Sequence, residues 1–491
     1  MIAARFDLRW IATIAVALIL VIALNPVGYV GGGSDDWQYL NAARCWAEYG
    51  PCLPHDHWQG RWPIVATVGT AIALLGESRT SIGLPNLAYS IGCLTLLAWF
   101  GNRIATKPVG YLAALFLLAT PAFAIELLEP AIGAAELFFL LAAASCVAMY
   151  HSTSSKTWIF ASGLSLGMAF QARDTAIAAL PLALLGACNV ARHDRKAWVL
   201  AAAGAALPLF IELLTFWIAT GDPLWRRHLS LAHTKILSSE LPAGIDLTRS
   251  PILNPEYIAN WHHVPGLKIH WTVDGPINLL ANAMAGLSLG LSLLLFAIYG
   301  RTLPIDRRRV VRWCLIIGFY WMCFLTYVLA IDPKPRMMFV PVSLAAIALS
   351  ILVVDLAKAG SRLLAIVAAC ANLAVGLAVI AAYPRISPAE VKFREWIVHY
   401  PGEIEASETT RRHLALVPAA RSLPDPGSGR ALMVIRVNMS CASWAKDEAD
   451  EPLLVVEQVP LNQINPLAGE QATNFCLFRY ASGRSLNSIA P

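Results

Sequence analysis

The sequence is poor in charged residues. Asp, Glu, Lys and Arg make up only 14% of its 491 residues, and 57% are apolar. A soluble globular domain has about a quarter charged residues. Because long uncharged runs recur along the chain, the composition excludes an ordinary soluble protein and predicts a polytopic membrane protein. The formal charge of +5 does not indicate a nucleic-acid partner, since the arginines lie in short loops between the apolar runs.

Two further absences narrow the possibilities. The sequence has no Cys-x-x-Cys motif, which disfavours a thiolate zinc site. It also shows no internal repeat, the feature on which many transporters are built. A transporter or flippase of a lipid-linked sugar or other substrate stays an alternative, as does a membrane scaffold with an external domain.

Eleven apolar runs reach or approach the length of a membrane-spanning helix. They are residues 10–30, 81–101, 108–125, 131–150, 157–172, 174–190, 197–220, 277–300, 311–331, 337–355 and 361–383. The fold class that we expect is therefore mainly α, a bundle of about eleven transmembrane helices.

The charged loops predict which way the bundle is oriented. Arg5 and Arg9 precede the first run, and no small-residue cleavage site follows it, so we expect a retained helix with a cytoplasmic N-terminus. The loops on that side are then short and basic, as the positive-inside rule requires. Their basic residues are Arg103, Lys107, Lys156, Arg192, Arg195, Lys196, Arg301, Arg307, Arg308, Arg309, Arg312, Lys358 and Arg362.

The polar segments fall on the external side in this orientation. The membrane domain, residues 1–383, has an external loop at 31–80 and another at 221–276. The apolar stretch 62–76 is short and begins near a proline, so we expect an interfacial helix there. Residues 384–491 combine an amphipathic segment, 387–401, with short β-branched or aromatic runs, which predicts a small external α/β domain.

Four of the ten cysteines also lie outside the apolar runs. Cys45 and Cys52 are in the first external loop, and Cys441 and Cys476 are in the tail. An oxidising compartment would favour two disulfides, one in each segment. The alternative is that each is a buried free thiol.

Two adjacent acids, Asp35 and Asp36, stand directly outside the first apolar run. They follow a glycine run, where the backbone can turn sharply, and they precede an amphipathic helix that one of them can cap. The surrounding loop has no excess of acids, so the pair is not part of a charge run. A solvated loop entry is the alternative interpretation.

Here the residues carry a resemblance to a known family. SDDWQYLNAARCWAEYG, then HDHWQGRWP, then the interfacial apolar helix resembles the polyprenyl-phosphate-sugar glycosyltransferases of the GT-C superfold. These include relatives of the protein O-mannosyltransferases and aminoarabinose transferases, of the bacterial family 39 and 83 type. The resemblance covers about residues 1 to 190 and recurs at 331–341, whereas the long loop and the tail match no pattern that we recognise.

The resemblance implies a reaction and a base. A sugar leaves a polyprenyl phosphate donor and is attacked by an acceptor hydroxyl of a lipid, a glycan or a protein. A carboxylate accelerates such a step by about 10²–10⁴-fold when it takes the proton of the hydroxyl. Attack opposite the phosphate predicts inversion. The family role passes to Asp35, with Asp36 as the alternative, because Asp36 stands where the family often has Glu.

The leaving phosphate requires cations on the external side, and Arg suits phosphate oxygens best. In IDPKPR the resemblance indicates Arg336, with Lys334 beside it, and in QARDT it indicates Arg173. Arg61 in QGRWP is a further candidate. Snorkelling, or pairing of Arg173 with Asp174 and of Arg336 with Asp332, is the structural alternative.

Two more acids and a histidine complete the candidates. Glu136 lies just inside an apolar run, where an ionisable group is costly, and Glu129 lies shortly before it. Either can position the sugar, pair with an arginine or help to hold a divalent cation, and a structural pair of Glu136 with Arg173 is equally open. His57 in HDH can position a substrate, and a metal at this motif is the weaker reading. The resemblance places the protein in a bacterial inner membrane, with its active site and its tail in the periplasm.

Overall fold

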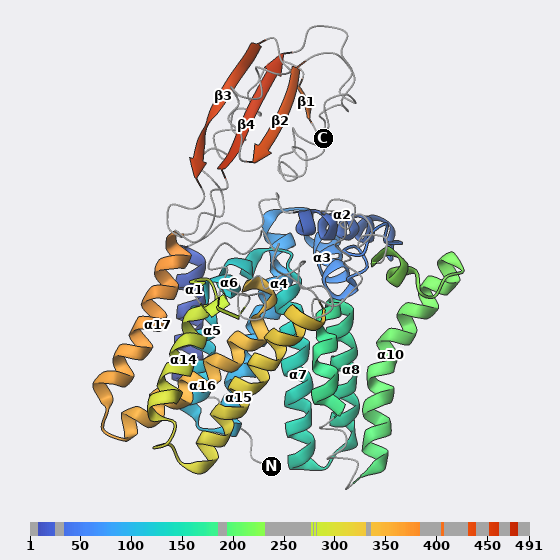
Figure 1. The fold of residues 1–491 in the computed structure, drawn as a ribbon. Coiled ribbons are helices and arrows are strands. Elements are labelled where there is room, and N and C mark those ends of the chain that lie inside the picture. The colour runs from blue at the N-terminus through green and yellow to red at the C-terminus, as the bar shows by residue number, and fades with distance from the viewer. Residues whose placement is uncertain are drawn as a thin grey trace.

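The computed structural model describes residues 8–24, 34–184, 194–230, 276–277, 279–280, 282–329, 335–382, 404–406, 431–437, 451–460 and 472–479. Most of these residues form a bundle of long helices that run side by side (Figure 1). The helices of the bundle are α1 (Leu8–Leu24), α4 (Arg79–Ile104), α5 (Lys107–Leu118), α7 (Ile132–Thr153), α8 (Lys156–Ala172), α10 (Arg195–Thr220), α14 (Gly286–Tyr299), α15 (Ile305–Cys323), α16 (Phe339–Lys358) and α17 (Arg362–Ala382).

Six helices in the described part of the chain are long and apolar enough to cross a membrane, which makes this a multi-pass membrane protein. They are α4, α7, α10, α15 with the π-helical turn η3 (Phe324–Val328), α16 and α17. The other predicted spans correspond to shorter or broken helices, so the count of eleven stays a prediction.

The run 108–125 is not one straight helix. It forms α5 and then α6 (Pro121–Ile125) with the 3₁₀ turn η1 (Glu126–Leu128), bent by 67° at the break. Pro121 explains the break, because proline has no amide hydrogen to continue the helical ladder. If the bent pair is one span, the described residues contain up to seven.

The run 174–190 also differs from the expected span. It starts as the 3₁₀ helix η2 (Asp174–Ala179), and the apolar helical segment described there ends at Leu184. The 3₁₀ start matters for the site, because it holds the first residues of this run in a tight turn at the end of the bundle.

The central helix of the bundle is α16. It packs against α5, α14, α15 and α17, and 83% of its apolar window is buried inside the protein. A helix that is apolar all round belongs at such a position. A second block consists of α7, α8 and α10. A Cβ on Gly163 would lie 2.0 Å from the carbonyl oxygen of Ala201, so only glycine allows α8 and α10 to approach this closely.

The two ends of the bundle differ in charge. The connections α4–α5, α7–α8, α14–α15 and α16–α17 lie at one end, the lower end in Figure 1, together with the start of α10. These connections carry the basic residues that the sequence assigns to the cytoplasmic side, such as Arg103, Lys156, Arg307 and Lys358. The arrangement agrees with the positive-inside pattern. The orientation in a membrane stays a prediction.

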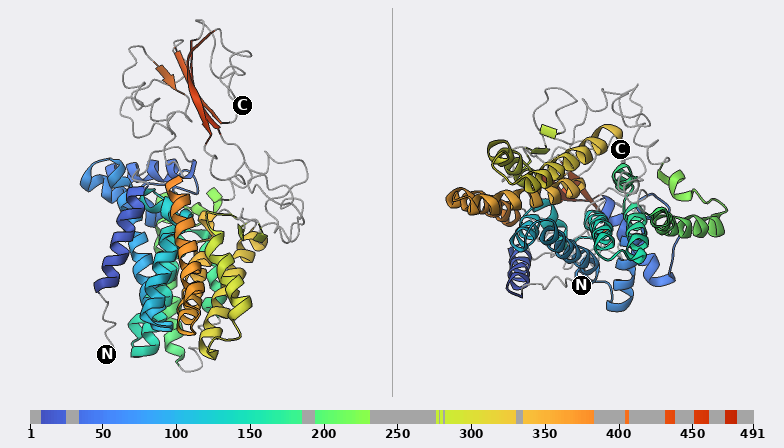
Figure 2. Two further views of the ribbon diagram at one scale, coloured as in Figure 1. Left: turned by 90° about the vertical axis from the view of Figure 1, so that its left-hand side faces the viewer. Right: turned by 90° about the horizontal axis from the view of Figure 1, so that it is seen from below.

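Two helices lie across the opposite end of the bundle (Figure 2), α2 (Ser34–Tyr49) and α3 (Trp62–Leu75). They pack on each other through an apolar cluster that includes Leu40, Ala43, Val68 and Ile72. Pro63 opens α3 in its first turn, where its missing amide hydrogen costs nothing. The segment 62–76 thus forms a helix beyond the long spans, at the place where the sequence predicts an interfacial one.

A disulfide joins the end of α2 to the loop that follows it, between Cys45 and Cys52, with the Cα atoms 6.0 Å apart. We expect Cys45→Ser to lower the free energy of unfolding by about 2–3 kcal/mol, because the bridge restricts the unfolded chain. The apparent Tm in detergent measures this effect. Cys370→Ser, at an exposed free thiol of α17, is the matched control, and equal Tm values for the two variants would contradict the expectation.

The described part of the tail is a four-stranded sheet of order β1-β2-β4-β3. Its strands are β1 (Ile404–Ala406), β2 (Ala431–Val437), β3 (Glu451–Pro460) and β4 (Ala472–Arg479). β1 and β2 are parallel, whereas β4 is antiparallel to both β2 and β3. The last three strands lie on the runs that the sequence predicts as strands. The helix expected at 387–401 lies outside the described residues, so an α/β domain at 384–491 stays a prediction.

Candidate active site

The first contact of the site joins two residues that are far apart in the sequence and lie at the same end of the bundle. Asp35 is in the first turn of α2, and Arg336 is in the short 3₁₀ helix η4 (Pro335–Met337), which precedes α16. Nη2 of Arg336 donates to Oδ2 of Asp35 over 3.0 Å, across a sequence separation of 301 residues. Both side chains stay partly exposed, 26% for Asp35 and 47% for Arg336, so a ligand can reach them.

Behind this pair lies a buried ion pair, between Arg173 and Glu136. Nη1 of Arg173 is 3.5 Å from Oε2 of Glu136, and each side chain is only 6% exposed. The hydroxyl of Thr175 donates to the other carboxylate oxygen of Glu136. The same Arg173 nitrogen also donates to the carbonyl of Arg336, 3.5 Å away. Arg173 therefore pairs with Glu136 and not with its neighbour Asp174.

Close helix packing brings these groups together. A Cβ on Gly133, at the start of α7, would lie 2.7 Å from the ring of Phe339 and 3.1 Å from the carbonyl of Arg336. Only glycine lets the start of α7, which carries Glu136, approach the start of α16 this closely. The ring of Phe339 also packs against Phe123 of α6 at 5.5 Å.

Arg61 lies at the start of α3, next to the same cluster. Its guanidinium donates to the carbonyl of Ala172 over 3.4 Å, and the residue is 9% exposed. Its Nε has no hydrogen-bond partner among the residues that the structure describes. A buried guanidinium with an unused donor can donate a hydrogen bond to an anionic ligand oxygen.

Tyr39 is a site residue that the sequence analysis missed. It stands four residues after Asp35, on the same face of α2, and is 3% exposed. The charged side chains close enough to act on its hydroxyl are those of Arg61, Asp35, Arg173 and Arg336. Burial raises the pKa of Tyr39 to about 12, so its hydroxyl stays protonated at physiological pH and can donate a hydrogen bond. An aromatic residue in an amphipathic helix signals packing in a sequence, which is why it was overlooked.

Glu126 is a second residue that the sequence analysis did not single out. It opens η1, is 8% exposed, and lies close enough to Arg336, Arg173 and Asp35 to interact with their charges. Its Oε2 has no hydrogen-bond partner among the described residues. The side-chain amide of Asn86 in α4 donates to its carbonyl and so holds the turn. The bend after α5 places Glu126 here, and that bend was not predicted.

The remaining candidates lie at the edge of the cluster or outside the described residues. Asp36 is close enough to Arg336 for the two opposite charges to interact. Glu129 is close enough to Glu126 for the two acids to repel each other. The ring of His57 lies 3.9 Å from that of Trp58, near Asp174. Lys334, Asp332, Cys441 and most of the loop 221–276 lie outside the described residues, as do the contacts of the Cys476 side chain.

No group of three or more His, Cys, Asp or Glu side chains is arranged to hold a metal ion in the described part of the chain.

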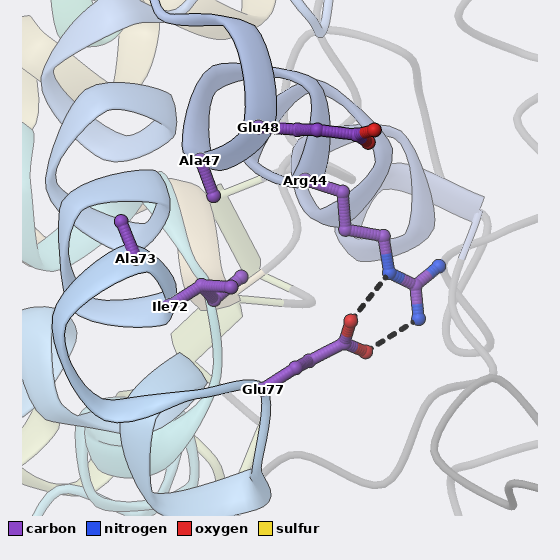
Figure 3. Close-up of a pocket in the computed structure, with 6 residues that line it drawn as sticks. All are labelled: Arg44, Ala47, Glu48, Ile72, Ala73 and Glu77. Atoms are coloured by element: carbon purple, nitrogen blue, oxygen red, sulfur yellow. Dashed lines mark hydrogen bonds and ion pairs between the residues drawn. The ribbon is translucent and has the colours of Figure 1, made fainter.

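An open pocket lies between the C-terminal halves of α2 and α3 (Figure 3), lined by Arg44, Ala47, Glu48, Ile72, Ala73 and Glu77. Figure 3 shows the guanidinium of Arg44 held at two atoms by Glu77, at 2.7 and 3.1 Å. None of the predicted site residues lines this pocket, and its only cation is already paired, so we place the candidate site at Asp35 and Arg336.

No protein-family model matches the sequence, and no curated protein matches it. Solved structures resemble its fold. The archaeal oligosaccharyltransferase AglB from Archaeoglobus fulgidus, in complex with an inhibitory peptide and a dolichol-phosphate, gives a TM-score of 0.52 at 11% identity, over 85% of this chain and 61% of that chain. This chain thus matches less than two thirds of the length of AglB.

A second similar structure is that of ArnT from Cupriavidus metallidurans bound to undecaprenyl phosphate. It gives a TM-score of 0.51 at 13% identity and covers 96% of this chain and 98% of that chain. At such identities the likeness concerns the fold. The assignment to families 39 and 83 stays a prediction. The predicted superfold is confirmed, and the chain has the GT-C fold.

Proposed function

We propose that this protein is an integral-membrane glycosyltransferase, which moves a sugar from a polyprenyl phosphate donor to an acceptor hydroxyl on the external face of the membrane. The observation that carries the proposal is the Asp35–Arg336 pair, a carboxylate and a guanidinium 3.0 Å apart at one end of a GT-C bundle. A base and a phosphate-binding cation are two groups that the reaction needs within one site.

The proposed chemistry begins at Asp35. Its carboxylate takes the proton of the acceptor hydroxyl while the oxygen attacks the anomeric carbon. The bond from that carbon to the phosphate oxygen breaks on the opposite side, which inverts the configuration. The same carboxylate also stabilises the positive charge that develops on the sugar ring.

The leaving polyprenyl phosphate is then held by the arginines. Arg336 is half-exposed and binds the phosphate directly, and Arg61 offers its unused Nε. Arg173 lies behind them, fixed by Glu136, and adds positive charge at low exposure, where charge acts more strongly than in water. The protonated hydroxyl of Tyr39 donates to the same oxygens.

The likeness to AglB and ArnT supports a lipid-linked donor, because those structures contain dolichol-phosphate and undecaprenyl phosphate. The acceptor is the open part of the proposal, and a lipid, a glycan and a protein hydroxyl all fit the chemistry. The charge asymmetry of the bundle supports an external site, since the basic loops lie at the far end from Asp35. A bacterial inner membrane, with the site and the tail in the periplasm, is part of the same proposal.

The test is a donor panel with the purified protein in detergent. Polyprenyl phosphates carrying different sugars are supplied with a membrane extract as acceptor, and the release of polyprenyl phosphate is followed. We expect release with one donor class, and we expect Arg336→Met to raise the KM for that donor by roughly 10–100-fold, the contribution of a hydrogen bond to a charged group. No release with any donor would favour the transporter alternative.

A further inference from the structure

A second charged cluster lies next to the candidate site and is not used by the proposed reaction. Its centre is Arg226, in the segment that follows α10, with an exposure of only 8%. One guanidinium nitrogen is 2.5 Å from Oδ1 of Asp174, and the other is 3.3 Å from Oε1 of Glu212 in α10. The carbonyl of Phe170 accepts a further hydrogen bond at 3.3 Å. Arg226 therefore joins α10, the end of α8 and the turn that starts η2.

This turn makes two sets of contacts. Arg173 has an extended backbone, with φ −160° and ψ 133°, and the 3₁₀ helix η2 begins at the next residue. Arg173 and Thr175 both contact Glu136. Asp174, between them, contacts Arg226 instead. The ion pair with Arg226 thus holds Asp174, which lies in the sequence between Arg173 and Thr175, the two residues that contact Glu136.

The same segment also rests on the first external loop. The indole nitrogen of Trp225 donates to the carbonyl of Pro54 over 3.0 Å. A Cβ on Gly60 would lie 3.5 Å from the side chain of Arg226, so the aliphatic part of Arg226 lies directly beside the residue before Arg61. Two arginines of the candidate phosphate site, Arg61 and Arg173, are therefore each adjacent in sequence to a residue that Arg226 contacts.

From this geometry we infer that Arg226 is a positioning residue for the donor phosphate: by holding Asp174 and packing on Gly60, it sets the places of Arg173 and Arg61. The inference rests on the proposed function, because it assigns these arginines to a lipid phosphate. Arg226 itself is turned toward Asp174 and Glu212 and does not touch the donor. Its loss should weaken donor binding and leave the proton transfer at Asp35 largely intact.

The test measures the binding of undecaprenyl phosphate to the purified full-length protein in detergent. Arg226→Met should raise the Kd about tenfold, a size typical of coupling between linked sites. With an active donor, the KM should rise by a similar factor while kcat changes little, a split that general destabilisation would not produce. Arg227→Met is the matched control, because it removes the same charge from the next residue, which is exposed. The control should bind as the wild type does.

A second variant separates positioning from folding. Arg226→Met alone leaves Glu212 as an unpaired buried carboxylate, which destabilises a protein strongly. We therefore expect Arg226→Met combined with Glu212→Gln to recover the Tm but not the affinity for undecaprenyl phosphate. Asp174→Asn should weaken binding on its own, and its effect should not add to that of Arg226→Met, because the two variants remove one contact.

The outcomes distinguish this inference from the proposed function. If the wild type binds undecaprenyl phosphate and the Arg226→Met/Glu212→Gln variant binds it equally well, the positioning role is wrong and the proposed function stands. If the wild type does not bind undecaprenyl phosphate at all, the donor assignment is wrong and the inference is wrong with it. Weaker binding in this variant, with Arg227→Met unchanged, supports both.

Discussion

Replacing Asp35 by asparagine should lower the rate of sugar transfer by about 10²–10⁴-fold, the usual contribution of a general base. The asparagine side chain has nearly the same size and can still accept the hydrogen bond from Arg336, so the fold and the insertion of the protein should not change. The loss should appear in kcat, measured as the release of polyprenyl phosphate at saturating donor, with the Kd for undecaprenyl phosphate nearly unchanged.

The neighbouring acids provide the controls. Asp36→Asn should have a smaller effect, because the structure pairs Asp35 with Arg336 directly, at 3.0 Å, and the charge of Asp36 ranks below that of Asp35 in its effect on this arginine. Asp56→Asn is the matched control in the same loop, since its Oδ1 accepts from the backbone of Gln59, and an asparagine oxygen can do the same. Full activity in both Asp35→Asn and Asp36→Asn would remove the proposed base from the mechanism.

Replacing Arg173 by methionine should destabilise the protein by about 3–5 kcal/mol, because it leaves one partner of a buried ion pair without its counter-charge. The partner is Glu136, whose side chain is 6% exposed. The apparent Tm in detergent should fall accordingly. Lys156→Met is the matched control: its pair with Asp194 is 3.4 Å long and lies at the surface, where water screens the charges and such pairs contribute little to stability.

The double variant Arg173→Met/Glu136→Met separates stability from function. A buried ion pair replaced by apolar side chains of similar volume is often no less stable, so the double variant should regain most of the Tm that Arg173→Met loses. It should not regain donor affinity, because the cation is still missing. Recovery of both would mean that the pair is purely structural, which is the alternative that the sequence left open.

The sequence could predict the candidate site in part, and the reasons differ from residue to residue. Glu136 was recognisable because an ionisable group just inside an apolar run is costly. Arg173 and Arg336 were indicated by the motifs that resemble the GT-C glycosyltransferases. Their partners were not. Asp174 and Asp332 are the acids nearest in sequence to the two arginines, yet Arg173 pairs with Glu136 and Arg336 with Asp35. Pairing depends on which helix ends meet, and sequence distance does not report that.

Tyr39, Glu126 and Arg226 were missed for a related reason. Each looks ordinary in the sequence, as an aromatic residue in an amphipathic helix, an acid in a turn, and one of two arginines in a polar loop. Their importance comes from burial, which is 3%, 8% and 8% exposure respectively. Burial of a polar group is a property of the packed chain, because helices from distant segments have to close over it.

The sequence by itself determined the class of this protein. Apolar runs of spanning length and basic loops between them require a multi-pass helical bundle, since a lipid bilayer accepts little else. The short polar motifs of the first external loop were sufficient for the GT-C resemblance. The tertiary structure alone decided the bend after α5, the partner of each arginine and the side chains that surround Asp35. Spans are determined by local composition, which any stretch of sequence reveals, whereas a site is determined by contacts between segments up to 301 residues apart.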